Sequence, residues 1–366
     1  MKNWRDWRND LLANPRFQTF AARFPLTRAI TRKRAAQVFD LCAGFVYSQV
    51  LYVCVVTDLF EHLRAGPREI GDLARFLNLS EDASLRLLRA AVALGLLEAR
   101  GAASFGLGQH GAALLGNPGA LAMIRHHNML YADLADPLAL LRGQGLPTRL
   151  QQYWAYARNP DRAQTQNDEV AAYSQLMSES QTLVRQDVLD VVNFADARQL
   201  VDIGGGEGSF AAEAARRWPG LSVTVFDLPA VAARAQARFE AEGLAGRAKG
   251  QGGDFYAGGL PQGADVMSLV RVLHDHDDDK AKALLRKIHA SLAPGGRLVI
   301  AEPMAGARDA QAMGDAYFGF YLLAMGSGRP RPAEEIEAML KAAGFSSTRR
   351  IPTPRPLLVS VIEARH

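Results

Sequence analysis

Apolar and polar positions follow different patterns in the two halves of the chain. The run from Phe39 to Phe60 is apolar nearly all round, which predicts a helix buried in an interface, and its uninterrupted part is too short to span a bilayer. Amphipathic patterns at 70–80 and 80–100 predict two helices, the second capped by Ser80, and 101–111 predicts a small hairpin. Helix, helix and hairpin in this order predict a mainly helical, winged-helix-like domain.

Beyond residue 195, short apolar strands alternate with helices. Strands are expected to end at Ile203, Asp227, near Val272 and at Glu302, and 348–366 supplies a last hairpin. This alternation predicts a doubly wound α/β domain. The expected parts are an N-terminal arm with a winged-helix-like domain at 1–110, linking helices at 111–195, and the α/β domain at 196–366.

Positive charge is concentrated at the N-terminus. Residues 1–40 carry nine Lys and Arg and three Asp, whereas the whole chain has a formal charge of +4, so the remainder is slightly acidic. A basic arm interleaved with aromatic residues is typical of a segment that lies on an anionic membrane surface, and it equally suits an arm that packs on a partner subunit. Nucleic acid is not expected as a partner, because the arm has no repeat and the rest of the chain is acidic. The aromatic residues of this arm are Trp4, Trp7, Phe17, Phe20 and Phe24.

Composition and cysteine usage indicate the compartment. The chain of 366 residues is 48% apolar and 22% charged, which is enough to bury a large core. The first twenty residues lack the apolar segment and cleavage site of a signal peptide. Cys42 and Cys54 both lie in apolar sequence, which indicates small core side chains and neither a disulfide nor a metal site. We therefore expect a cytoplasmic protein without a metal.

The stretch LVDIGGGEGSF, from Leu200 to Phe210, carries the first candidate site. Glycines in a turn between a strand and a helix allow a ligand to touch the backbone. A dinucleotide fingerprint needs a third glycine where this chain has Ser209, which argues against an NAD-dependent oxidoreductase. The D-x-G-x-G-x-G pattern instead resembles the first motif of class I S-adenosylmethionine (SAM) methyltransferases. The residues in this pattern are Asp202, Gly204, Gly205, Gly206 and Gly208.

Two later motifs favour the same cofactor. Asp227 ends the second strand, where a carboxylate can accept hydrogen bonds from both ribose hydroxyls. Asp254 followed by Phe255 resembles the methyltransferase pair that holds the adenine amino group and stacks on its ring. The alternative for Asp254 is an aspartate that caps its own loop.

A candidate acid–base pair follows. His274 and Glu302 are expected at the carboxyl ends of adjacent strands, the edge where open α/β sheets bind ligands. A hydroxyl that attacks a methyl group must lose its proton, and a neutral imidazole is a base available near pH 7. We expect His274 to be the general base and Glu302 to orient it, with capping of the next helix as the alternative for His274. His276 and Asp277 to Asp279 are assigned to the N-terminus of that helix.

Together these residues resemble the O-methyltransferases of the plant phenolic and hydroxyindole type and their bacterial relatives. The resemblance rests on VDIGGGEG, FDLP, GGDF, LHDHDDD, APGGRLVIAEP and EEIEAMLKAAGF, and it covers nearly the whole chain. It implies SAM as methyl donor, a seven-stranded Rossmann-like SAM domain, and an N-terminal domain that forms a homodimer. The chain departs from the family at three positions: His276 replaces a tryptophan, Val270 a lysine near the cofactor, and Pro330 a second glutamate beside the base.

Two segments are expected to form the wall of the acceptor pocket. Tyr173 and Met177 lie on one face of a helix, where family members carry an aromatic residue and a methionine beside the acceptor. Phe318, Tyr321 and Met325 lie in an apolar stretch that precedes the last helix. A core stripe is the alternative in both cases.

The run FPLTRAITRKRAAQVFDLCAGFVYSQVL resembles more narrowly the hydroxyneurosporene, or demethylspheroidene, O-methyltransferases of purple photosynthetic bacteria. The resemblance implies methylation of the C1 hydroxyl of acyclic carotenoids, and it suits a peripheral position on the photosynthetic inner membrane. Two alternatives stay open. One is a bacteriochlorophyll precursor or a small aromatic acceptor, and the other is a non-catalytic, SAM-sensing or DNA-binding regulator built on the same fold.

Overall fold

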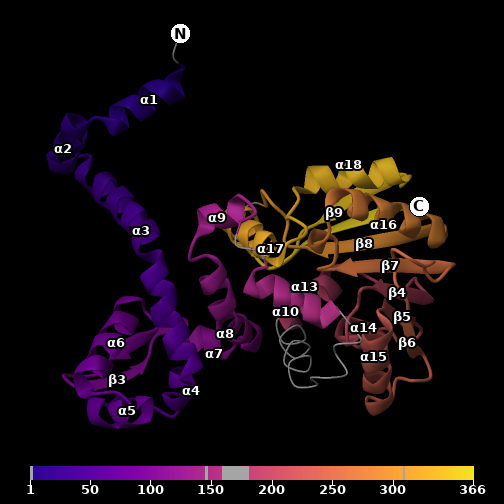
Figure 1. Ribbon diagram of the computed structural model, residues 1–366, viewed down its shortest axis with the longest axis horizontal. Helices are drawn as coiled ribbons and strands as arrows, with labels where there is room; N and C mark the ends of the chain where they lie inside the picture. Colours follow the sequence, from indigo (N-terminus) through magenta and orange to yellow (C-terminus); the bar gives the residue numbers. More distant parts are fainter. Residues whose placement is uncertain (1–2, 145–146, 159–180, 308–309) are drawn as a thin grey trace. The chain divides into compact units, whose positions relative to one another are not determined.

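The chain divides after Asn117 into two units, residues 1–117 and 118–366. The computed structural model describes residues 3–144, 147–158, 181–307 and 310–366 (Figure 1). The finer three-part division expected from the sequence stays a prediction.

The first unit contains a helix, a second helix and a hairpin in the predicted order, but the bounds differ: the second helix ends at Ala93 and not near Arg100, and the hairpin occupies 97–107 and not 101–111. Ser80 caps the second helix, because its side chain accepts a hydrogen bond from the Ala83 N–H at 3.2 Å. The hairpin pairs β2 (Leu97–Ala99) with β3 (Ser104–Leu107), and β1 (Arg68–Glu69), which the sequence did not indicate, completes the sheet in the order β1-β3-β2. The helices of this unit are α1 (Trp4–Ala13), α2 (Pro15–Arg23), α3 (Arg28–Val56), α4 (Leu59–His62), α5 (Ile70–Leu77), α6 (Glu81–Ala93) and α7 (Gln109–Leu115).

Helix α3 is longer than its apolar run predicted. It begins at Arg28, so its 29 residues are long and apolar enough, by length and composition alone, to cross a membrane, whereas the expectation from the sequence concerned only the shorter uninterrupted apolar run. It ends before Asp58, whose φ of 54° breaks the run that was expected to continue to Phe60. Cys54 is fully buried, as predicted for a core side chain. Cys42 is exposed in the single chain, so the same prediction was wrong for Cys42.

The second unit is built on a seven-stranded sheet in the order β6-β5-β4-β7-β8-β10-β9. All neighbouring strands up to β8 are parallel, and β10 is antiparallel to both β8 and β9. The order reverses between β4 and β7, which is the switch point where doubly wound sheets bind ligands. The predicted fold class is therefore confirmed. The strands are β4 (Gln199–Ile203), β5 (Ser222–Asp227), β6 (Ala248–Gly252), β7 (Ala264–Val270), β8 (Leu292–Glu302), β9 (Ser347–Ile351) and β10 (Ser360–Arg365).

Both faces of this sheet are buried. In β4, Leu200 joins an apolar cluster that includes Phe210 and Phe239, whereas Val201 joins a second cluster that includes Leu284. Strand β10 is likewise buried on both faces from Val361 to Ala364. The helices are α8 (Pro118–Asp133), α9 (Pro137–Leu141), α10 (Arg149–Arg158), α13 (Thr182–Val191), α14 (Ser209–Arg217), α15 (Pro229–Ala241), η1 (Leu273–Asp275), α16 (Asp278–Ser291), η2 (Ala312–Phe318), α17 (Gly319–Met325) and α18 (Ala333–Ala343).

Candidate active site

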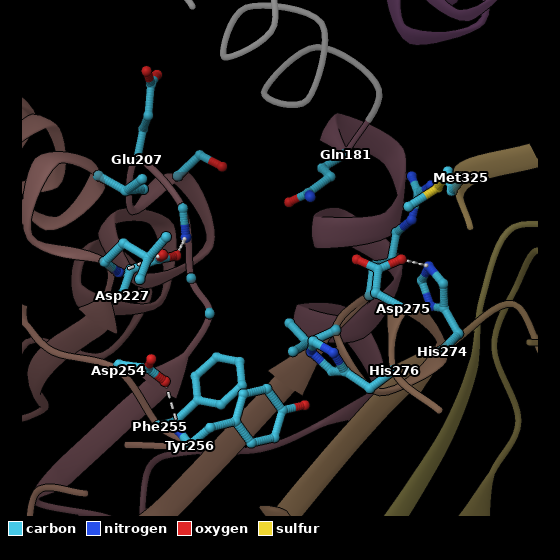
Figure 2. A pocket seen from close by; sticks show the side chains of 18 of the residues that line it. Gln181, Glu207, Asp227, Asp254, Phe255, Tyr256, His274, Asp275, His276 and Met325 are labelled. Carbon is cyan, nitrogen blue, oxygen red and sulfur yellow. Dashed lines mark hydrogen bonds and ion pairs between the residues drawn. The ribbon is translucent and has the colours of Figure 1, made fainter. Parts of the chain in front are cut away.

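A cavity of about 400 Å³ opens at the carboxyl ends of the parallel strands. This volume is in the range of small-molecule sites. Figure 2 shows Asp227 and Asp254 on one side of the cavity and His274 with Asp275 on the other. The residues predicted from the sequence that line it are Gly204, Gly205, Gly206, Asp227, Asp254, Phe255, His274, Phe318, Tyr321 and Met325. Asp202, Gly208 and Glu302 lie behind this lining, and Tyr173 and Met177 lie outside the described residues.

The glycine-rich turn follows β4 and leads into α14. Gly206 has a φ of 59°, and its N–H donates a hydrogen bond to Oδ2 of Asp227 at 2.8 Å. Gly208 has a φ of 76°, and a Cβ there would lie 2.6 Å from the ring of Phe239. Positive φ and this close approach explain why the turn uses glycine.

Asp202 has one oxygen that is satisfied and one that is not. The Ser268 hydroxyl donates to Oδ1 at 2.6 Å, whereas the buried Oδ2 has no hydrogen-bond partner among the described residues. A Cβ on Gly205 would overlap Oδ2. Burial raises the pKa of Asp202 to about 7, the Ser268 hydrogen bond opposes this, and the charge of Asp227 adds to it. The unsatisfied oxygen fits a ligand that brings an N–H donor.

Asp227 ends β5 and is held by the backbone. Its Oδ1 accepts from the Leu228 N–H at 2.7 Å, and its Oδ2 accepts from the Gly206 N–H. Burial raises the pKa of this carboxyl, and the two N–H donors oppose the rise. A fixed carboxylate at this position fits a diol such as ribose.

Asp254 and Phe255 follow β6. Oδ1 of Asp254 accepts from the Tyr256 N–H at 2.7 Å, so this aspartate caps its own turn while it lines the cavity. Lys287 donates from Nζ to the carbonyls of Phe255 and Tyr256, at 3.0 and 2.6 Å, which holds the loop from outside. The ring of Phe255 meets the ring of His276 edge-on, with centroids 5.5 Å apart.

His274 lies in η1, between two carboxylates. Its Nδ1 bonds to Oε2 of Glu302, at the end of β8, and its Nε2 lies 3.2 Å from Oδ1 of Asp275. Burial of the ring favours the neutral form, but the charges of Glu302 and Asp275 outweigh burial and raise the pKa of His274. His274 is 6% exposed, and Asp277, not His274, occupies the N-cap position of α16.

The acidic run after His274 divides between the helix and the cavity. Asp278 and Asp279 lie in the first turn of α16 and Asp277 precedes it, as expected. His276 lines the cavity, so its assignment to the helix terminus was incomplete. Asp275, which was not predicted as a site residue, faces the second ring nitrogen of His274.

The other wall of the cavity comes from η2 and α17. The ring of Phe318 meets the ring of His274 edge-on, with centroids 6.0 Å apart. The guanidinium of Arg271 lies 5.8 Å from the centre of the Phe318 ring. Arg271 has a φ of 57°, an uncommon backbone conformation for a residue other than glycine that is found at functional sites. The helix η2 has π geometry, which also recurs at functional sites.

Two histidines of α8 hold this wall in place. Nε2 of His127 bonds to the Tyr317 hydroxyl at 2.7 Å, and Nε2 of His126 bonds to the Tyr321 hydroxyl at 3.2 Å. Burial lowers the pKa of His126 to about 4 and lowers that of His127, so both rings are neutral near pH 7. These pairs could not be predicted from the sequence, because their members lie about 190 positions apart and follow no motif.

Comparison with known proteins places the chain among methyltransferases. A model of the O-methyltransferase domain matches residues 131–346, and a model of the O-methyltransferase dimerisation domain matches residues 39–117. The chain is 42% identical to the demethylspheroidene O-methyltransferase of Cereibacter sphaeroides, over 97% of this chain and 93% of that protein. It is 43% identical to the demethylspheroidene O-methyltransferase of Rhodobacter capsulatus, over 93% of this chain and 85% of that protein. Among solved structures, the S-adenosylhomocysteine-bound form of CalO1, a methyltransferase in calicheamicin biosynthesis, matches with a TM-score of 0.74 and 25% identity, over 90% of this chain and 98% of that one.

Proposed function

This chain belongs to the O-methyltransferase family, as a SAM-dependent enzyme, and from that premise we propose that it methylates the C1 hydroxyl of acyclic hydroxycarotenoids. Hydroxyneurosporene and demethylspheroidene are the expected acceptors, in carotenoid biosynthesis of the spheroidene type. The observation that carries the proposal is the identity of 42 and 43% to two demethylspheroidene O-methyltransferases over nearly the whole chain.

The residues on the Asp227 side of the cavity fit SAM, which supplies a methyl group on a sulfonium sulfur. Asp202 would accept from the amino group of its methionine part, because Oδ2 is buried and unsatisfied. Asp227 would accept from the ribose hydroxyls, and the loop that carries Asp254 and Phe255 would hold the adenine. The backbone of the glycine-rich turn passes between these groups.

His274 is the proposed general base. Transfer of a methyl group to a hydroxyl forms an O–C bond, breaks the S–C bond and releases the hydroxyl proton. Nε2 of His274 would take this proton, while Glu302 at Nδ1 would stabilise the imidazolium that results. A tertiary alcohol is a weak acid, so proton removal must accompany attack and not precede it.

The charge state of His274 sets a condition for this role. To accept a proton, Nε2 of His274 must be unprotonated. Asp275 faces that nitrogen, however, and the carboxylates of Asp275 and Glu302 both favour the protonated ring. A cationic sulfonium and an apolar acceptor in the cavity both disfavour a second positive charge there. Binding of the two substrates would therefore release the base, and Asp275 would turn from the ring as the acceptor enters.

The acceptor would lie against the apolar wall. Phe318, Tyr321 and Met325 line the cavity from η2 and α17, and Met123 lines it from α8. Phe318 touches the His274 ring, so this wall reaches the proposed base and suits the terminal part of a polyene. We propose Phe318, Tyr321 and Met325 as acceptor contacts.

A methyl-transfer assay tests the activity. Radiolabelled SAM is incubated in detergent with 1-hydroxyneurosporene or with a simple phenol, using the wild type and His274→Ala. Label in the carotenoid that is lost in the variant is the expected result. Label in the phenol alone would replace the carotenoid by a small aromatic acceptor, and label in neither, with SAM still bound by calorimetry, would favour a SAM-sensing regulator.

The dimerisation domain and an uncovered helix support a homodimer. The domain model begins at residue 39, within α3. Along α3 of the single chain, Phe39, Leu41 and Phe45 are 64, 85 and 74% exposed. Apolar side chains so exposed on a long helix suit an interface with a second copy, because burial of apolar area is favourable. We propose that α3 forms the dimer interface.

The arm before α3 is proposed to touch the membrane. Helix α1 has no buried residue, and Trp4 and Phe20 are 69 and 57% exposed among the cations of the arm. A carotenoid resides in the bilayer, so an arm that binds anionic lipid would bring the enzyme to its acceptor.

Sedimentation with phosphatidylglycerol and with phosphatidylcholine vesicles tests membrane binding by the arm, with a variant lacking residues 1–27 as control. Salt-sensitive binding to the anionic vesicles alone, lost on truncation, is expected. Equal sedimentation of both proteins would refute membrane binding by the arm and leave packing on a partner subunit as the alternative.

A further inference from the structure

The loop that carries His274 is covered by a second segment, distant in sequence. We call residues 272–277, between β7 and α16, the base loop, and residues 326–331, between α17 and α18, the strap. The strap follows the wall that carries Phe318 and Tyr321. It contains Pro330, which stands where the family resemblance leads us to expect a second glutamate beside the base.

Each backbone carbonyl from Leu273 to His276 accepts a hydrogen bond from the strap. The guanidinium of Arg331 donates from NH1 to Leu273 O at 3.1 Å and from NH2 to His276 O at 2.6 Å. The Arg329 N–H donates to His274 O at 2.9 Å, and the Ser327 hydroxyl donates to Asp275 O at 3.0 Å. On the opposite side, Glu302 binds the N–H groups of Val272 and Leu273. The base loop is therefore held by Glu302 through its donors and by the strap through its acceptors.

The strap is shaped for this contact. Gly328 has a φ of 80°, and a Cβ there would overlap the carbonyl oxygen of His274. Pro330 and Pro332 restrict the residues before them to extended conformations, which directs Arg329 and Arg331 to the same side of the chain. Both arginines accordingly reach the carboxylate of Asp278, at the start of α16.

Arg331 is the centre of the strap. Its side chain is 1% exposed, although its ion-pair partner Asp278 is 39% exposed. A guanidinium presents a planar fork of donors, so it can bond to two carbonyls and a carboxylate at once, which an ammonium group on a single stem cannot reproduce. Because this one buried guanidinium donates hydrogen bonds to Leu273 O and to His276 O, it fixes the distance between these two parts of the base loop.

We propose that Arg331 is a positioning residue for methyl transfer, which sets the base loop so that the His274 ring stays on Glu302 with Nε2 at the cavity, facing Asp275 until the acceptor enters. The inference rests on the proposed role of His274. Arg331 does not line the cavity, so it would act through the loop and not on the substrates directly.

The test compares Arg331→Met and Arg331→Lys with Arg350→Met. Arg350 is the matched control, because it also pairs with carboxylates, Glu334 and Glu337 on α18, but contributes nothing to the base loop. The pKa of the His274 ring is measured by NMR on histidine-labelled protein, and kcat, KM and SAM affinity are measured on the same samples. In Arg331→Met we expect kcat to fall roughly ten- to hundredfold, as for a misplaced catalytic group, with SAM affinity nearly unchanged. The pKa of His274 should move down toward its ordinary value, Arg331→Lys should lie between, and Arg350→Met should match the wild type.

Three outcomes overturn the proposal. They are a wild-type kcat and His274 pKa in Arg331→Met, a loss of kcat that parallels a loss of SAM binding while the pKa stays put, and an equal effect of Arg350→Met. If Arg331→Met does not fold, Ser327→Ala and Arg331→Lys decide, since each removes part of the strap and should shift the same pKa in the same direction. His274→Ala separates the two proposals. Full activity in His274→Ala would refute His274 as the base. The pKa of the His274 ring, compared between the wild type and the Arg331 variants, would still report whether Arg331 positions the ring.

Discussion

Glu302 binds both the ring of His274 and the loop that carries it. Oε2 contacts Nδ1 of His274, and Oε1 accepts from the backbone N–H groups of Val272 and Leu273 at 3.0 and 2.7 Å. One buried carboxylate thus sets the orientation of the imidazole and the conformation of its backbone. In a buried site such an anion also favours the protonated ring, so it helps the base to hold a proton that it has accepted.

The first prediction removes the charge of this carboxylate. Glu302→Gln keeps an oxygen for the two N–H groups but leaves the imidazolium without its anion, so kcat should fall about a hundredfold, roughly 2.7 kcal/mol in the barrier. Glu363→Gln is the control. That glutamate is also buried, on the neighbouring strand β10, where it pairs with Arg297, and it does not line the cavity. A Glu302→Gln enzyme with wild-type kcat would refute the role of Glu302.

The second prediction concerns the pH dependence of kcat/KM. The active form of His274 is neutral, and its pKa in the free enzyme is raised to about 9. The rate should therefore rise with pH on an acidic limb that lies well above the ordinary histidine value of about 6.5. Asp275→Asn removes one of the two charges that raise this pKa, so its limb should move to lower pH. A limb that does not move in Asp275→Asn would contradict the electrostatic role of Asp275.

The third prediction follows from the same raised pKa, through stability. The folded-state pKa of His274 lies above its unfolded value, so the protonated ring adds stability that is complete below about pH 6.5 and lost as pH rises through about 9. The Tm difference between the wild type and Asp275→Asn should accordingly be larger at pH 6 than at pH 10. Thermal unfolding across this range, without ligands, measures it. A difference that grows with pH would have the wrong sign.

The fourth prediction tests the glycine-rich turn. In Gly208→Ala the new side chain would have to adopt a φ of 76°, and its Cβ would lie 2.6 Å from the ring of Phe239. This substitution should therefore destabilise the fold by about 2 to 4 kcal/mol. Gly220 is the matched control, because a Cβ there has nothing within 4 Å and its φ is not positive, so Gly220→Ala should have an effect of less than about 0.5 kcal/mol. Urea unfolding compares the two. Equal stabilities would show that the turn tolerates a side chain.

The fifth prediction concerns the proposed dimer. Leu41→Asp combined with Phe45→Asp places two charges on the exposed apolar face of α3, and burying them in an interface is costly. Light scattering should then show a monomer, whereas Leu357→Asp, at an exposed leucine of the second unit, should leave the mass of the wild type. A double variant that keeps the wild-type mass would move the interface away from α3.

Much of the fold and part of the site could be predicted from the sequence, because the signals are local. The strand that carries Asp202 near its end and the strand that ends at Asp227 are short apolar runs, and their order in the chain predicts a doubly wound sheet. Parallel strands of such a sheet bring their carboxyl ends to one edge. Residues at those ends, among them His274 and Glu302, could therefore be expected together without knowledge of any side-chain contact.

The contacts that decide how His274 behaves were not predictable in this way. Asp275 is adjacent to His274 in sequence, but only the turn of η1 brings its carboxylate to Nε2. Arg331 lies 58 positions from Leu273, and nothing in its neighbourhood marks it as a partner of that loop.

The length of α3 and the exposure of its apolar side chains in the single chain could not be predicted from the sequence either. Periodicity and strand-end position are properties of neighbouring residues, so the sequence by itself determined the class of fold, the cofactor motifs and the candidate base. Which carboxylate faces which ring nitrogen, and which distant arginine holds the loop, depends on how separate segments pack. Only the tertiary structure decided these, because packing is set by the shapes of all the segments at once.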